Sequence, residues 1–267
     1  MNPAAADSPS ALERLIRRDR VIVGVGLVCL TALSWVYLAS MAGGMHSAAI
    51  EADMHAAMGM PEMGAWGVGT VIALFLMWAV MMVGMMLPSA APMMLLVLGA
   101  YRRRGAHAVR ASGALFIAGY LVAWFAFSAA ATAGQVLLHR AALLTPEMAS
   151  RSTFIAGAIL VAAGVYQWLP IKTACLTHCR SPLGFLTAHW REGARGALSM
   201  GLAHGWFCIG CCWAVMALLF VVGVMNLLWV ALIAAFVLIE KLTPAGPAVG
   251  RMAGVLLIGW GAYVLVA

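Results

Sequence analysis

The sequence contains little charge. Of its 267 residues only 9% are charged, and Asp and Glu together number nine. A soluble domain carries about a quarter charged residues, so this chain could not cover a water-facing surface with polar groups. It also lacks a Walker-type phosphate loop, a GxSxG nucleophile motif, the Cys-Pro-Cys of a metal pump and an internal repeat. These absences exclude a soluble domain and an ATP-driven pump.

Apolar residues, by contrast, are abundant. The chain is 64% hydrophobic, its mean hydropathy is +0.98, and about 20 apolar residues suffice for a membrane-spanning helix. We therefore predict an all-α, polytopic integral membrane bundle with a tail at 1–20 and a single transmembrane domain at 21–267. About seven transmembrane helices are expected, at 21–42, 66–98, 111–138, 154–169, 197–224, 227–239 and 252–267. The last two are short, and a turn at 244–247 predicts that they form a tight hairpin.

The run at 66–98 is longer than one span and contains two prolines. Proline removes a backbone donor and clashes with the preceding turn. Pro88 and Pro92 therefore predict that this helix ends or kinks near Leu87, where Ser89 can help to satisfy the freed backbone.

The basic residues predict how the chain is oriented. With the N-terminus in the cytoplasm, 14 of the 16 Lys and Arg residues lie on the cytoplasmic side and only Arg140 and Arg151 lie outside. The formal charge of +7 therefore reports topology in a bacterial inner (plasma) membrane, with the lipid bilayer as partner and no nucleic acid. The segment 171–195 is then cytoplasmic, and a Met-, His- and acid-rich loop at 43–65 is extracytoplasmic.

The run at 197–224 carries the sharpest motif. His204, Cys208, Cys211 and Cys212 are spaced so that a helix returns them to one wall. Thiolates and imidazole suit Cu(I) or Zn(II), although cysteine is also a small apolar packing residue. Adjacent Cys211 and Cys212 point about 100° apart, so we expect only one of them to join Cys208 as a ligand.

A second Cys-His motif lies in the segment 171–195. On one helical turn Cys175, His178 and Cys179 could clamp a single ion, and chain order lets them fold beside the helix at 197–224. The six cysteines are therefore interpreted as reduced thiols and not as a disulfide framework.

Weaker candidates lie elsewhere. Met81 and Met85 belong to a methionine stripe that could pass Cu(I) but that suits core packing better. The 43–65 loop could collect a metal ion, or could be solvated chain with chance enrichment; its candidate ligands are His46, Glu51, Asp53 and His55. Glu240-Lys241, at the end of an apolar run, is interpreted as an interfacial anchor whose lysine snorkels.

Several stretches together resemble a bacterial family described as predicted metal-binding integral membrane proteins of unknown function. The resemblance runs from about residue 20 to the C-terminus and implies a metal site at the Cys-His motifs, but it names no reaction. The stretches that carry it are MMVGMMLPSAAPM at 81–93, YQW at 166–168, CLTHCRSPL at 175–183, GCCW at 210–213, GVMNL at 223–227 and EK at 240–241.

Three hypotheses follow for the function. The first is a protein that handles or transports copper(I) through Cys, His and Met ligands, with a metal chaperone or other membrane subunits as partners. The second is a membrane metalloenzyme or oxidoreductase subunit with copper or iron at the nitrogen and oxygen ligands of the 43–65 loop. The third is a structural subunit without metal. Zinc or iron are the alternative metals, and whether the protein is an enzyme stays open.

Overall fold

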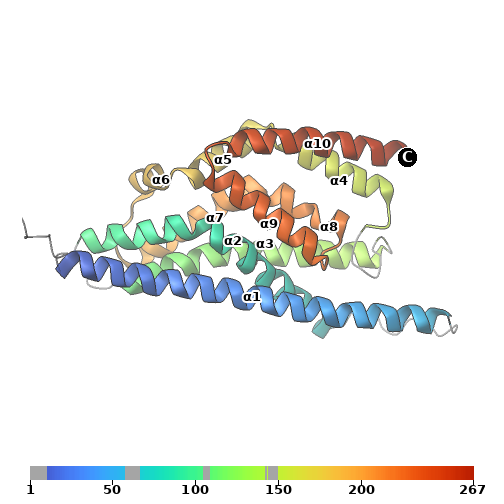
Figure 1. Cartoon of the computed structure of the whole chain (residues 1–267), viewed down its shortest axis with the longest axis horizontal. Helices are drawn as coiled ribbons and strands as arrows, with labels where there is room; N and C mark the ends of the chain where they lie inside the picture. Colours follow the sequence, from blue (N-terminus) through green and yellow to red (C-terminus); the bar gives the residue numbers. More distant parts are fainter. Residues whose placement is uncertain (1–10, 58–66, 105–108, 142, 144–149) are drawn as a thin grey trace, which may run out of the picture.

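The computed structural model describes residues 11–57, 67–104, 109–141, 143 and 150–267, and within the first helix it describes side chains for Arg18 and residues 21–44. The described chain is all-helical, as predicted, and it forms an elongated bundle (Figure 1). Its elements are α1 (Ala11–Ala57), α2 (Val68–Arg103), α3 (Val109–Arg140), α4 (Thr153–Tyr166), α5 (Pro170–Arg180), α6 (Pro182–His189), α7 (Gly193–Ala217), α8 (Leu219–Val222), α9 (Leu227–Leu242) and α10 (Gly246–Val266).

Helix α1 is longer than the sequence analysis expected. It begins at Ala11, within the predicted tail, and continues to Ala57, so the predicted loop at 43–65 is wrong as far as that residue. The segment 45–57 contains five alanines, two methionines and one glutamate, which are strong helix formers, and it contains no proline. The side chains of His46, Glu51, Asp53 and His55, and residues 58–66 altogether, lie outside the described part of the structure.

Helix α2 passes through both prolines without ending. It is continuous from Val68 to Arg103, so it does not end near Leu87, but its two halves run in different directions (Figure 1), which is the kink that the prolines predicted as the alternative. Two hydroxyls bind the backbone beside Pro88: the Ser89 hydroxyl donates to the Met86 carbonyl at 2.9 Å and the Tyr120 hydroxyl donates to it at 3.2 Å. These bonds brace the helix next to the proline, although the carbonyl that Pro88 leaves without its usual donor is that of Gly84.

The helix that precedes the second Cys-His motif ends close to the predicted position. Helix α4 ends at Tyr166, three residues before the predicted Leu169, and α5 begins at Pro170 and leaves α4 at an angle of 64°. Proline suits the first turn of α5, where a backbone N–H would have no helical partner. The bend directs α5 against α7, which places two separate sequence motifs side by side.

Helix α7 lies at the centre and packs against α3 at very short range. A Cβ atom on Gly201 would lie 2.0 Å from the Phe116 carbonyl oxygen, and one on Gly119 would lie 2.2 Å from that of Leu198. Only glycine permits this approach of two backbones, a device common between membrane helices. It positions Tyr120 of α3 beside the cysteines of α7.

The last two helices are longer than predicted, and they do not form a simple hairpin. Helix α9 extends through Glu240 and Lys241 to Leu242, and α10 begins at Gly246 and packs mainly along α4 (Figure 1). Gly164 and Gly254 allow that contact, since a Cβ on Gly164 would lie 2.7 Å from the Gly254 carbonyl oxygen.

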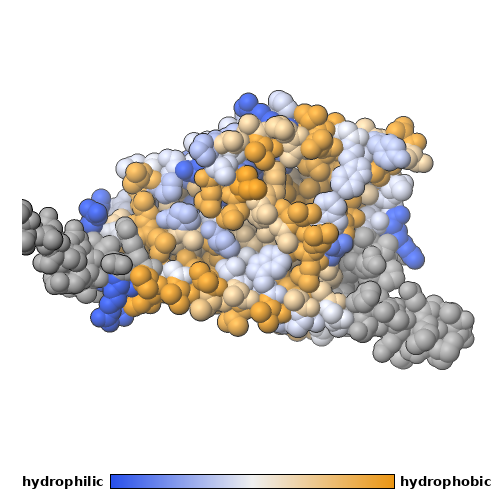
Figure 2. All heavy atoms as spheres, in the orientation of Figure 1, coloured by the Kyte–Doolittle hydropathy of each residue, from blue (hydrophilic) through white to orange (hydrophobic). Residues whose placement is uncertain are grey.

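Five helical segments in the described residues are long and apolar enough to cross a membrane: Val21–Gly44, Val68–Arg103, Val109–Arg140, Gly193–Val222 and Gly246–Val266. The bent pair α4 and α5 would make a sixth if it counts as one span. Apolar side chains cover much of the face in Figure 2, and the strongly hydrophilic ones lie mostly toward the two ends of the molecule. This surface fits lipid as its solvent.

Candidate metal centre

The four predicted residues of α7 lie inside the bundle. His204, Cys208, Cys211 and Cys212 are each at most 2% exposed. The thiols of Cys211 and Cys212 both donate to the Cys208 carbonyl, at 3.1 and 2.8 Å respectively, which fixes their rotamers along the helix. All six cysteines are free thiols. The helical spacing therefore yields one buried wall of sulfur.

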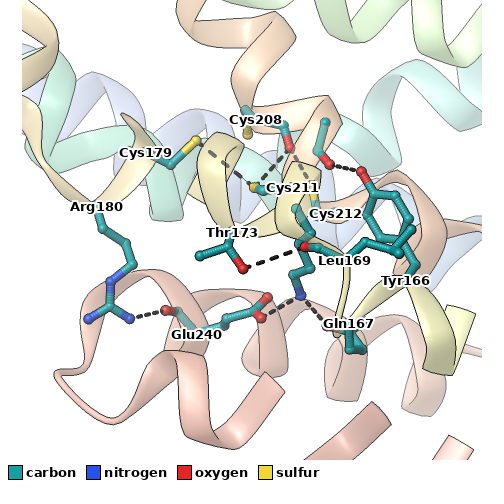
Figure 3. A network of polar contacts seen from close by, with 12 residues as sticks. Tyr166, Gln167, Leu169, Thr173, Cys179, Arg180, Cys208, Cys211, Cys212 and Glu240 are labelled. Carbon is teal, nitrogen blue, oxygen red and sulfur yellow. Dashed lines mark hydrogen bonds and ion pairs between the residues drawn. The ribbon is translucent and has the colours of Figure 1, made fainter. Parts of the chain in front are cut away.

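Helix α5 adds cysteines from the second motif. The Sγ atoms of Cys179 and Cys211 are 3.9 Å apart, across the α5–α7 interface (Figure 3). Cys175 lies one turn before Cys179 in α5, where its Sγ atom occupies space left by Gly210 and would be 2.6 Å from a Cβ there. The two motifs, about 30 residues apart in the sequence, thus form a single cluster of thiols.

Cys208 has two polar partners that the sequence analysis did not connect with it. The Lys241 ammonium donates to its Sγ atom at 2.9 Å, and the Tyr120 hydroxyl lies 3.1 Å from the same sulfur. Lys241 also donates to the Ser89 hydroxyl at 3.2 Å. A cation buried beside a sulfur stabilises negative charge on it, and the thiolate is the form of cysteine that binds metals.

Glu240 and Lys241 are therefore not an interfacial anchor, and that interpretation is wrong. They are 1% and 6% exposed, because both side chains, near the end of α9, point into the bundle. Lys241 reaches Cys208, whereas Glu240 faces the other way and pairs with Lys172 of α5 at 2.5 Å. The Lys172 ammonium also contacts the Gln167 side-chain oxygen.

Glu240, Lys172 and Gln167 form a second polar group, which lies below the cysteines in Figure 3. The Arg180 guanidinium donates to the Glu240 carbonyl oxygen at 2.8 Å, which ties the end of α5 to α9. Gly250 of α10 leaves room for the Glu240 carboxylate, since a Cβ there would lie 2.3 Å from its Oε1 atom. Buried charges need such partners, because an unpaired one is costly.

His204 lies one turn before Cys208 among aromatic rings. Its ring centroid is 5.2 Å from that of Phe185, 5.8 Å from that of Tyr120 and 6.0 Å from that of Phe116. Its Nδ1 atom is buried and has no hydrogen-bond partner. Most buried polar atoms are paired, so this nitrogen has an unused capacity to bind a ligand.

The remaining candidates do not join this cluster in one ligand shell. His178 turns its ring onto Phe207, with the centroids 4.2 Å apart, and does not clamp an ion together with Cys175 and Cys179. Met81 and Met85 are buried core residues, as the packing interpretation expected. Within the described residues no group of three or more His, Cys, Asp or Glu side chains is close enough to hold a metal ion. The Cys179–Cys211 pair is a soft-ligand contact between α5 and α7.

Sequence reasoning missed Lys172, Glu240 and Lys241 as members of this centre. The sequence did contain an indication that Glu240 and Lys241 are buried, because they follow an uncharged run of 13 residues at 227–239. An ionisable residue at membrane depth is a functional candidate by default. Tyr120 gave no comparable indication.

The chain was also compared with known proteins. A family model described as PpoB2, copper chaperone, matches residues 75–264, well over half of the chain, from the second turn of α2 to the end of α10. No curated protein and no solved structure matches the chain. The matched region contains every cysteine of the cluster and both of its buried lysines. The chain belongs to the PpoB2 copper-chaperone family.

Proposed function

We propose that this protein is an integral membrane protein that binds copper(I) as cargo at the buried thiols between α5 and α7. The observation that carries the proposal is the 3.9 Å separation of the Cys179 and Cys211 sulfur atoms. With metal–sulfur bonds near 2.3 Å, as in zinc thiolates, an ion shared equally by these sulfurs would have an S–metal–S angle of about 115°. That angle leaves room for a third ligand.

Two groups are suited to complete the site. Cys208 is on the same wall of α7 and carries the buried ammonium of Lys241 beside it, and His204 brings an unpaired ring nitrogen. Cys212 is held through the Cys208 carbonyl and supports the wall. Soft thiolates with imidazole select Cu(I) over harder ions, in keeping with the copper-chaperone family.

The membrane setting also supports a role in moving copper. The methionine-lined α2 touches the cluster through Tyr120, whose hydroxyl contacts both the Met86 carbonyl and the Cys208 sulfur. In this proposal the thioethers along α2 accept an ion from the extracytoplasmic side and pass it to the cysteines, or the reverse. A carrier protein or membrane subunit would then take the ion from the cytoplasmic end.

The test is the copper content of the protein purified in detergent without chelator, measured by mass spectrometry. We expect bound copper in the wild type and a loss of at least half of it in Cys211→Ser. Cys29→Ser is the matched control, since Cys29 is exposed on α1 and should keep full copper. Unchanged copper in Cys211→Ser would refute the site, and copper or iron lost only on replacing His46 and His55 would favour the metalloenzyme hypothesis. A wild type without metal would favour a structural subunit.

The orientation is a separate prediction. Of the 14 Lys and Arg residues on the cytoplasmic side of the predicted topology, Lys172 and Lys241 are buried in the bundle, but the other 12 still outnumber the two outside. Ser181, between α5 and α6, should therefore face the cytoplasm. In a Cys29→Ser background, a Ser181→Cys variant should react with a membrane-impermeant thiol reagent only after the cells are broken. Labelling in intact cells, at a rate equal to that in lysed cells, would reverse the proposed topology.

A further inference from the structure

The sulfur of Cys208 is joined by two routes of hydrogen bonds to one carbonyl group of α2. On the first route its Sγ atom lies 3.1 Å from the Tyr120 hydroxyl, which lies 3.2 Å from the Met86 carbonyl oxygen. On the second route the Lys241 ammonium donates to the same sulfur at 2.9 Å and to the Ser89 hydroxyl at 3.2 Å. The Ser89 hydroxyl then donates to the Met86 carbonyl at 2.9 Å. Together the five contacts close a ring of polar atoms.

This ring lies where α2 changes direction. Its members are at most 7% exposed, so no bulk water competes for these hydrogen bonds. Met86 lies two residues before Pro88, which has no N–H to donate within the helix. Sharp bends in helices occur at such prolines, and the two halves of α2 run in different directions (Figure 1). Hydrogen bonds from other helices therefore help to set the angle of the bend.

Tyr120 has one hydroxyl proton and two acceptors for it at nearly equal distances. The Lys241 ammonium favours the thiolate form of Cys208, and a charged sulfur attracts the proton more strongly than a neutral carbonyl does. Copper(I) bound to that sulfur takes up one of its lone pairs and offsets its negative charge. The hydrogen bond from Tyr120 to the sulfur then weakens, and the one to the Met86 carbonyl strengthens. Lys241 faces no such choice, because an ammonium has three protons.

We propose that Tyr120 is a positioning residue that couples copper bound at Cys208 to the bend of α2; this inference rests on the proposed function. A stronger bond from Tyr120 draws the Met86 carbonyl toward α3, and the angle between the two halves of α2 changes. The half that precedes the proline carries Met81 and Met85. An ion that reaches Cys208 thereby moves the methionines of the proposed path relative to the thiols.

The experiment measures this movement by double electron–electron resonance in the detergent-purified protein, with and without Cu(I), which is diamagnetic. Nitroxides are attached to p-acetylphenylalanine at positions 72 and 263, because a ketone-directed label leaves the cysteines free. Ile72 and Tyr263 are 54% and 69% exposed, in the first half of α2 and near the end of α10. Ile72 lies roughly 21 Å along the helix from Met86, so a change of about 10° in the bend moves it by about 4 Å. We expect copper to shift the distance between the labels by about 2–4 Å.

Tyr120→Phe removes only the hydroxyl and should abolish the copper-dependent shift. Tyr101→Phe is the matched control, because Tyr101 is also a buried tyrosine with one backbone hydrogen bond, to the Arg191 carbonyl oxygen at 2.9 Å. Its hydroxyl takes no part in the ring, so the control should keep the shift of the wild type.

Copper content, measured on the same samples, separates the outcomes. Bound copper without a shift in the wild type overturns the inference and leaves the copper site standing, and this comparison depends on no variant. A shift in Tyr120→Phe as large as that of the wild type also overturns it, because the coupling would then run elsewhere. A wild type that binds no copper refutes the proposed function, and this inference with it.

Discussion

Changing Glu240 to Ala is expected to destabilise the folded protein by about 3–5 kcal/mol, because it leaves the Lys172 ammonium buried without its carboxylate. Both side chains of this pair are 2% exposed, and their atoms approach to 2.5 Å. A shift of that size lowers the midpoint of thermal unfolding by on the order of 10 °C in a chain of this length. The measurement is thermal unfolding in detergent, followed by circular dichroism or light scattering.

The matched control for this prediction is the ion pair of Arg104 and Glu192. It joins side chains that are 57% and 79% exposed at 3.6 Å, so Glu192→Ala should have almost no effect. A second variant, Lys172→Met with Glu240→Gln, removes both charges and should recover much of the lost stability, since no unpaired charge is then left buried. Equal stability of Glu240→Ala and the wild type would mean that this ion pair does not support the fold.

Changing Lys241 to Met is expected to weaken copper(I) binding by about tenfold to a hundredfold, which is the loss of one hydrogen bond to a charged group. The Lys241 ammonium is 2.9 Å from the Cys208 sulfur and is the cation that Cys208 touches in the described structure. Without it, negative charge on the buried thiols is less stable, and metal ligands must be thiolates. The measurement is competition for Cu(I) with a chromogenic chelator of known affinity.

Lys241→Arg is the conservative control, because it keeps the positive charge and should retain most of the affinity. A folded Lys241→Met protein with undiminished or tighter copper binding would contradict the prediction, and would indicate that the lysine competes with the metal for Cys208. Unfolding is excluded by comparing the elution profile with that of the wild type.

Much of the secondary structure could be predicted from the sequence. Apolar runs gave the helices α3 and α4 to within a few residues, and the proline after Leu169 marked the end of α4. These features depend on neighbours along the chain, namely hydrophobic length and the missing N–H of proline. At Pro88 the sequence left two outcomes open, and α2 changes direction there without ending (Figure 1). Local rules failed in 43–57, where strong helix formers continue α1.

The candidate site was only partly visible in the sequence. The spacing of His204, Cys208 and Cys211 fixed their common wall, because a helix repeats every 3.6 residues. The spacing did not predict which residues of other helices face that wall. Lys241, for example, contacts Cys208, 33 positions away in the sequence, and Ser89, 152 positions away, and no local pattern connects residues so far apart.

By itself the sequence determined that the chain is helical and apolar and that α7 carries one stripe of soft ligands. Only the tertiary structure decided that Cys179 meets Cys211, that Lys241 turns inward to Cys208 and that Tyr120 lies between Cys208 and Met86. The physical reason is that hydrogen bonds within a helix are local, whereas contacts between helices depend on bends such as the one at Pro170 and on close approaches such as the one at Gly201. Those features set which faces meet, and the chemistry of the site follows from them.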